Sequence, residues 1–144
     1  MASGPPVWDP DGSDLTLAHT GYHIQPGSPH PRMTQHAMPG VDGAFVGFHG
    51  VGPRIWHGRG FLEVNLAASA AAAADDLKAA IIARQGKVAA EIKTYRDSTG
   101  DDYTYCVLLA YRTAGPITTH LESDGQSYTA RCAVTFTIME QDPT

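Results

Sequence analysis

The chain has few cysteines and no long apolar run, and each absence excludes a class of protein. Only Cys106 and Cys132 occur among its 144 residues. Both lie in strand-like segments, so we expect two small buried side chains in a reducing compartment, with a single bridge between paired strands as the alternative. No apolar stretch approaches the roughly 20 residues of a membrane span, and the N-terminus lacks the pattern of a secretory signal. We expect a protein that folds in the cytosol and does not bind membranes by itself.

Positive charge is also sparse. Ten Lys and Arg residues oppose fifteen Asp and Glu residues, which gives a net charge of −5. The basic residues stand singly along the chain, so the sequence contains no basic stripe of the kind that neutralises phosphates. Nucleic acid is therefore not expected as a binding partner. A chain of this length buries roughly two-thirds of its surface on folding, which is enough for one domain without metals or disulfides.

The short motifs of common enzyme classes are missing. No serine lies in a Gly-x-Ser-x-Gly elbow, and the segment Gly50–Pro53 lacks the lysine and hydroxyl of a phosphate loop. Neither cysteine lies in an electropositive turn that would lower its pKa. The pairs Asp75–Asp76 and Asp101–Asp102 consist of adjacent side chains that point in different directions, as solvated charges do. We predict that the chain is not an enzyme, with no catalytic residue and no cofactor.

Histidine is the residue type that most invites a metal site, with seven in the chain and six of them between His19 and His57. His19 and His23 share a strand face, but a rise of ~3.3 Å per residue separates them by about 13 Å, too far for one metal ion. A metal site has to draw instead on residues brought together by turns, namely His49, His57, and His30 or His36. We interpret the histidines as surface or interface residues and assign no metal ligand.

The stretch from Arg54 to Gln85 organises the chain. Residues 54–64 predict a strand, with one face of mixed polar character and a second face that is apolar and contains two glycines. The second face consists of Trp56, Gly58, Gly60, Leu62 and Val64. Its glycines leave room for a bulky group to cross the strand.

Residues 66–85 predict a helix, because the segment is rich in alanine and contains no Gly or Pro before Gly86. Asn65 or Ser69 is suited to the N-cap position. One helix face is expected to be buried against a sheet, and it consists of Ala70, Ala73, Ala74, Leu77, Ala80, Ile81 and Arg84.

The remaining segments alternate between strand patterns and turn residues. Strands are predicted over 15–24, 32–38, 44–49, 87–95, 103–111 and 128–138, with turns at 26–29, 39–43, 50–53, 96–102 and 123–125. The strand 103–111 is apolar on both faces and is therefore expected to be buried on both sides or covered at an interface. The core face of the last strand consists of Tyr128, Ala130, Cys132, Val134, Phe136 and Ile138.

These elements define a mainly β fold with one helix (β + α), an antiparallel sandwich or split barrel of about seven or eight strands flanked by the helix at about 66–85. The domain spans 15–140. Residues 1–14 are rich in Pro, Gly and Asp and are expected to form a flexible N-terminal arm, with a short C-terminal tail at 141–144. Trp8 in the arm is interpreted either as a plug that docks on a neighbouring subunit or as a residue packed on its own domain.

Three segments together resemble a known family. They are Met38–Ala44 with its Pro-Gly and Gly turns, Pro53–Leu62 with its Gly-Arg-Gly strand followed by an alanine-rich helix, and the closing strand with Val134-Thr135-Phe136. In this pattern the chain, over residues 15–140, resembles small tail proteins of tailed bacteriophages. It is most similar to the distal tail proteins and the related DNA-circularisation-type tail proteins. Unlike the larger members, it carries no appended carbohydrate-binding domain, so contact with a host receptor is not implied.

The resemblance implies a virion structural protein that forms a homo-oligomeric ring, commonly six-fold, at the distal end of the tail tube. Such a ring joins the tube to the tip or baseplate hub, is assembled in the host cytoplasm, and meets DNA only as cargo passing through its lumen. The closest alternative is a tail tube or tail terminator subunit of the same kind of particle. An alternative from a different class is a cytosolic β module that uses its histidines to bind a metal or small ligand.

Overall fold

The computed structural model describes residues 4–25, 28–37 and 44–141 of the chain. Its elements in chain order are β1 (Val7–Trp8), β2 (Leu15–Thr16), β3 (Thr20–Ile24), β4 (Ser28–Ala37), β5 (Ala44–Ala67), α1 (Ala70–Gln85), β6 (Lys93–Arg96), β7 (Asp102–Thr113), β8 (Thr118–Leu121) and β9 (Tyr128–Glu140). The predicted class, mainly β with one helix, is confirmed. Among the described residues there is no helix with the length and apolar character that crossing a membrane requires.

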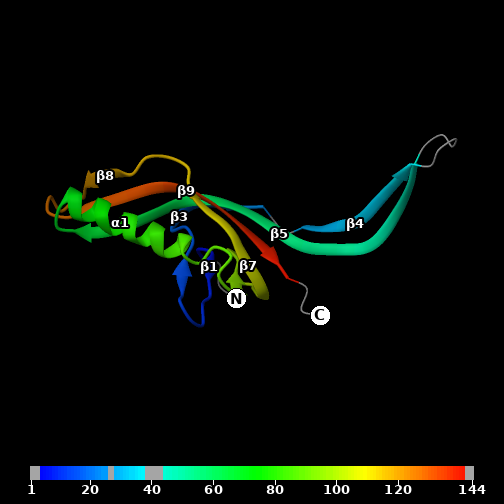
Figure 1. Cartoon of the computed structure of the whole chain (residues 1–144). Helices are drawn as coiled ribbons and strands as arrows, with labels where there is room; N and C mark the ends of the chain where they lie inside the picture. The colour runs from blue at the N-terminus through cyan, green and yellow to red at the C-terminus, as the bar shows by residue number, and fades with distance from the viewer. Residues whose placement is uncertain (1–3, 26–27, 38–43, 142–144) are drawn as a thin grey trace.

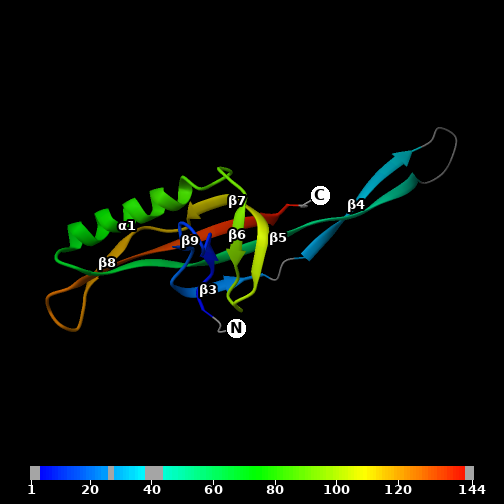
Figure 2. The same ribbon diagram turned by 90° about the horizontal axis from the view of Figure 1, so that it is seen from below.

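All strands belong to one antiparallel sheet, in which β2, β1, β6, β7, β9, β5 and β3 follow one another. The sheet does not close, because β2 and β3 are edge strands at its two ends. In addition, β4 pairs with β5 and β8 pairs with β9. Helix α1 lies along one face of the β5–β9 pair, as Figure 2 shows. The fold is therefore a sandwich-like arrangement of a long sheet with a single helix on it.

The core lies between α1 and the inner face of the sheet, of which β1 is part. It contains the apolar face of β5 predicted above, with Trp56 and Leu62 buried, and the predicted face of β9 from Ala130 to Ile138. The bulky group expected to cross the glycines of β5 is the ring of Phe136, which lies over Gly58. A second glycine, Gly60, lets the segment at Ala18 approach β5 closely.

Helix α1 begins later than expected but ends where predicted. Ser69 is the N-cap, its hydroxyl oxygen accepting a hydrogen bond from the backbone N–H of Ala72 at 3.1 Å, and Gly86 ends the helix. The helix begins at Ala70 instead of about 66, because β5 continues through Ala67. The predicted buried face is confirmed, since its buried residues are Ala73, Leu77, Ile81 and Arg84.

The turn predicted at Gly50–Pro53 is wrong, because β5 runs without a break from Ala44 to Ala67. The register with β4 shifts twice in this region, from Pro29 opposite Arg54 to Pro31 opposite Val51 and then to Met33 opposite Phe48. Each shift places one extra residue on β5, as in a β-bulge. Glycine and proline are tolerated at such bulges, so turn-type residues here mark irregularities within a strand.

The N-terminal segment also differs from the flexible arm expected for 1–14. Within the described residues 4–14, β1 pairs with both β2 and β6, and Trp8 is completely buried in the core of its own domain. The carboxylate of Asp9 closes the following turn by accepting from the backbone N–H of Ser13 at 3.0 Å. An indole that fills the domain core supplies the apolar burial that the composition of this segment did not predict.

The other differences concern strand boundaries. The strand predicted at 15–24 is divided into β2 and β3, because the backbone changes partner between them. The Leu17 N–H still donates to the Pro6 carbonyl oxygen at 2.8 Å, whereas the His19 N–H donates to the Phe61 carbonyl oxygen on β5 at 2.8 Å. Residues 87–90 form a turn, so β6 starts at Lys93, and β8 was not predicted. On β7 only one face is buried, leaving Tyr105 and Leu109 exposed. The turns predicted at 26–29 and 39–43, and the tail at 141–144, lie wholly or partly outside the described residues.

Candidate functional site: the open face of the sheet

One face of the sheet, formed by β3, β5, β9 and β7, carries most of the chemistry. Along β5, the residues Ile55, His57, Arg59, Phe61 and Glu63 alternate with the buried core residues and therefore point away from the core. Helix α1 packs on the opposite, inner face. We call the outward surface of β3, β5, β9 and β7 the open face.

Strand register arranges the open face in rows, because residues directly opposite on neighbouring strands share a face. Arg59 is opposite His23 on β3 and Thr135 on β9, and Thr135 is in turn opposite Arg112 on β7. This row therefore places two guanidinium side chains on either side of one hydroxyl. We call Arg59, Thr135 and Arg112 the cationic row.

The neighbouring rows differ in polarity. On one side His57 is opposite Thr137, and its Nδ1 lies 3.4 Å from the Thr137 hydroxyl oxygen. On the other side Phe61 is opposite Ala133, forming an apolar row. The guanidinium of Arg131 covers the Phe61 ring at 3.8 Å and forms an ion pair with Glu63 at 3.3 Å.

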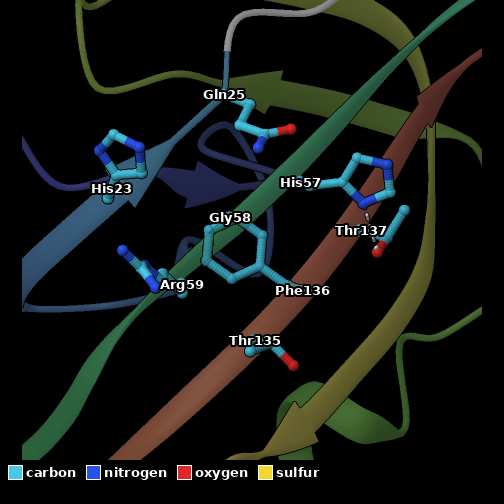
Figure 3. A pocket seen from close by; sticks show the side chains of 8 residues that line it. All are labelled: His23, Gln25, His57, Gly58, Arg59, Thr135, Phe136 and Thr137. Carbon is cyan, nitrogen blue, oxygen red and sulfur yellow. Dashed lines mark hydrogen bonds between the residues drawn. The ribbon is translucent and has the colours of Figure 1, made fainter.

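The open face is hollowed by two adjoining depressions, each of about 450 Å³. The first is lined by His23, Gln25, His57, Gly58, Arg59, Thr135, Phe136 and Thr137. Figure 3 shows the two imidazoles and the Arg59 guanidinium around this depression, with the Phe136 ring at Gly58. The second depression shares Arg59 and Thr135 with the first and continues over Phe61 and Ala133. None of the described residues that line the two depressions carries a carboxylate.

The cationic row is not neutralised within the described part of the chain. Ion pairs are formed instead by partly buried basic groups, namely Lys87 and Lys93 with Glu91, Arg96 with Asp102, and Arg131 with Glu63. Arg59 and Arg112 form no ion pair and no side-chain hydrogen bond with any described residue, although both are exposed. Two unpaired cations thus lie together on a chain whose net charge is −5.

The histidines do not assemble as a metal centre within the described residues, which contain no group of three potential ligands. His19 instead accepts a hydrogen bond at Nδ1 from the backbone N–H of Glu63, 3.1 Å away. Partial desolvation, with the positive charge of Arg84 second, lowers the pKa of His19 below its usual 6.5. His120 Nε2 lies 3.2 Å from a carboxylate oxygen of Glu122 on another part of the surface.

Sequence reasoning considered His19 with His23 and His49 with His57, whereas the structure brings His23 and His57 to one depression. The side chains of His30, His36 and His49 lie outside the described part. Arg59, Thr135 and Arg112 were not singled out from the sequence. The alternation of each strand already placed Arg59 and Thr135 on outward faces, but the pairing of the strands, which brings them together, was not predicted.

The cysteines confirm their interpretation as buried thiols. Cys106 and Cys132 are both buried and are not joined to each other. Burial, with Glu140 second, raises the pKa of the Cys106 thiol to about 12, which keeps it protonated and unreactive near neutral pH.

The chain matches no known protein family model. Nor does it match any curated protein. The sequence resemblance described above and the fold are therefore the basis for the function proposed next.

Proposed function

We propose that this protein is a virion structural subunit that forms a homo-oligomeric ring in the tail of a tailed bacteriophage. In this proposal the ring lies at the distal end of the tail tube, joins the tube to the tip or baseplate hub, and is commonly six-fold. The resemblance of residues 15–140 to distal tail proteins motivates the proposal. Its physical support comes from one structural feature, the β4–β5 hairpin.

The β4–β5 hairpin extends far beyond the body of the domain (Figures 1 and 2). Within the described residues, β9 pairs with β5 only from Ile55 inward, so the part of β5 from Ala44 to Arg54 has β4 as its sole described strand partner. At 3.3 Å per residue this outer ribbon is about 35 Å long. A two-stranded ribbon is marginally stable alone in water. A projection of this length is therefore best explained as an arm that a neighbouring subunit covers.

A contact in which an arm of one subunit is covered by the next is compatible with assembly into a ring. An arm that reaches a different surface on the next copy makes a head-to-tail contact, and such contacts close into a ring when the rotation divides a full turn. The open face of the sheet offers a second surface that the described residues leave uncovered. Within this proposal the DNA passes through the lumen as cargo, which agrees with an acidic chain without a basic stripe.

Electron microscopy of negatively stained purified protein, with light scattering for the mass, tests the proposal. Rings of one layer are the expected result, whereas long stacks identify a tube subunit. A variant without the arm provides the comparison. In it, an Asn-Gly turn replaces residues 30–53 and connects Pro29 to Arg54, which are paired in the ribbon. It is expected to keep a cooperative thermal transition and to lose the rings. A wild-type chain that stays a compact monomer at every concentration refutes the proposal.

The histidine-based metal or ligand module has less support. Two imidazoles, His23 and His57, share one depression, but no third potential metal ligand joins them among the described residues. A rise in melting temperature on adding zinc or nickel, without association, favours this second function, since a ligand that binds only the folded state raises stability.

A further inference from the structure

Two surfaces on opposite sides of the molecule carry opposite charge. The first is the cationic row of the open face, where Arg59 and Arg112 flank Thr135. The second is the outer surface of α1, which faces away from the sheet. On it, Asp75 and Asp76 are exposed and form no ion pair and no side-chain hydrogen bond with the described residues. Lys78 forms no ion pair with them either. This surface therefore carries two carboxylates against one ammonium group, and its net charge is negative.

Each surface also has an apolar part next to its charged part. On α1, Ile82 lies two turns from Asp75 and is 67% exposed, the largest exposed fraction among the large hydrophobic side chains described. The distance along the helix axis is about 10 Å at 1.5 Å per residue. On the open face, the apolar row of Phe61 and Ala133 lies one row from the cationic row, about 7 Å along the strand. The spacing on the helix exceeds the spacing on the open face by less than the length of an arginine side chain, so the charged parts and the apolar parts can meet at the same time.

The arrangement of the two surfaces fits association between copies. A patch on one side of a subunit that binds a different patch on the opposite side of the next subunit gives a head-to-tail contact. Another exposed acidic pair, Asp11 and Asp14, interacts electrostatically with Arg96 of its own chain. Among the described residues, none of the exposed large hydrophobic side chains comes from the same element or turn as that pair, whereas Ile82 shares a helix with Asp75. The helix surface is therefore the better complement to the cationic row.

We propose that the outer surface of α1 in one copy docks on the open face of the next copy. Asp75 and Asp76 meet Arg59 and Arg112, and Ile82 enters the depression beside Phe61. This inference rests on the proposed function, because it names a second contact, besides the β4–β5 arm, that joins neighbouring subunits. Charge complementarity of this kind sets partner choice and register as well as affinity.

Charge reversal with rescue tests the contact. Two double variants, Arg59→Glu with Arg112→Glu and Asp75→Arg with Asp76→Arg, are compared with their quadruple combination by light scattering over a concentration series. Each double variant is expected to raise the concentration at half-assembly at least about tenfold, because like charges then face each other. The quadruple variant restores opposite charges and is expected to assemble at close to the wild-type concentration.

The matched control reverses the other acidic pair, with Asp11→Arg and Asp14→Arg, and is expected to assemble as the wild type does. The side chains substituted in the two double variants are exposed, so their melting temperatures are expected to change little. The control is expected to melt at a lower temperature, because Asp14 has a φ of 50° and both carboxylates interact with Arg96, and its assembly is therefore measured where it is fully folded. If wild-type rings form and both double variants form them equally well, the docking contact is refuted while the ring function stands. Folded double variants that lose assembly without rescue in the quadruple refute the pairing. A wild-type chain that never associates refutes the ring function and this contact together.

Discussion

The contact between Gly58 and Phe136 allows a sharp test of how the sheet is packed. A Cβ atom added at Gly58 lies 2.3 Å from Cζ of the Phe136 ring, far inside van der Waals contact. The ring is only 2% exposed and stacks on Tyr111 with a centroid distance of 6.3 Å. Since the ring is buried and packed against Tyr111, Gly58→Ala must displace packed side chains or backbone. We expect this substitution to destabilise the fold.

The size of the effect follows from two opposing contributions. Overpacking a well-packed core costs about 1–3 kcal/mol. Replacing glycine by alanine recovers about 0.4–1 kcal/mol by restricting the unfolded chain. The expected net loss of unfolding free energy is about 1–2 kcal/mol. For a chain of this length that loss corresponds to a fall in melting temperature of roughly 3–6 °C.

Urea and thermal unfolding followed by circular dichroism measure the change, with Gly115→Ala as the matched control. At Gly115 an added Cβ meets only the Cβ of Ala133 at 3.8 Å, so this variant is expected to be at least as stable as the wild type, with a gain of about 0.4–1 kcal/mol from the restricted unfolded chain. Combining Gly58→Ala with Phe136→Leu is expected to cost less than the sum of the two changes, by at least about 0.5 kcal/mol. Strict additivity, or a Gly58→Ala variant with wild-type stability, refutes the packing of Phe136 over Gly58.

Three further predictions concern the helix cap, a histidine and a thiol. Ser69→Ala removes the acceptor for the Ala72 N–H and is expected to lower the unfolding free energy by about 1 kcal/mol, measured in urea; an unchanged midpoint contradicts the cap. Because the pKa of His19 is lowered in the folded state, the unfolded chain binds its proton more tightly. Stability is therefore expected to fall as pH drops below about 6.5, and to fall less in His19→Gln; parallel pH profiles of unfolding free energy count against this role. Cys106, with its pKa raised to about 12, is expected to resist iodoacetamide at pH 8 until the protein is unfolded. Rapid alkylation of the native protein shows that the thiol is not enclosed.

The sequence predicted the features that depend on neighbouring residues. The alanine-rich segment ends at Gly86 as expected, and its buried face with Leu77 and Ile81 follows from a period of 3.6 residues. The core face of β9 and the glycine face of β5 follow from a period of two. These periods report which side chains share a face, whatever that face packs against.

The candidate site could be predicted only in part, because periodicity along a strand shows which side chains share a face but not which strand lies beside it. Alternation along β5 and β9 placed Arg59 and Thr135 on outward faces, but nothing in either strand specifies its partner. The cationic row exists because β5 and β7 both pair with β9, and Arg112 comes from a strand more than fifty residues after Arg59. Pairings between such distant segments depend on the whole core, so local patterns do not encode them.

Local sequence thus determined the helix, its end at Gly86 and the inward faces of the long strands, because propensity and periodicity act over a few residues. Tertiary structure alone decided that β5 continues through Gly50–Pro53 by bulging against β4, and that Trp8 fills the core of its own domain. In both cases the same residues suit two local conformations. The choice between them is made by contacts with distant segments, whose free energy exceeds the local preference of a turn or an arm.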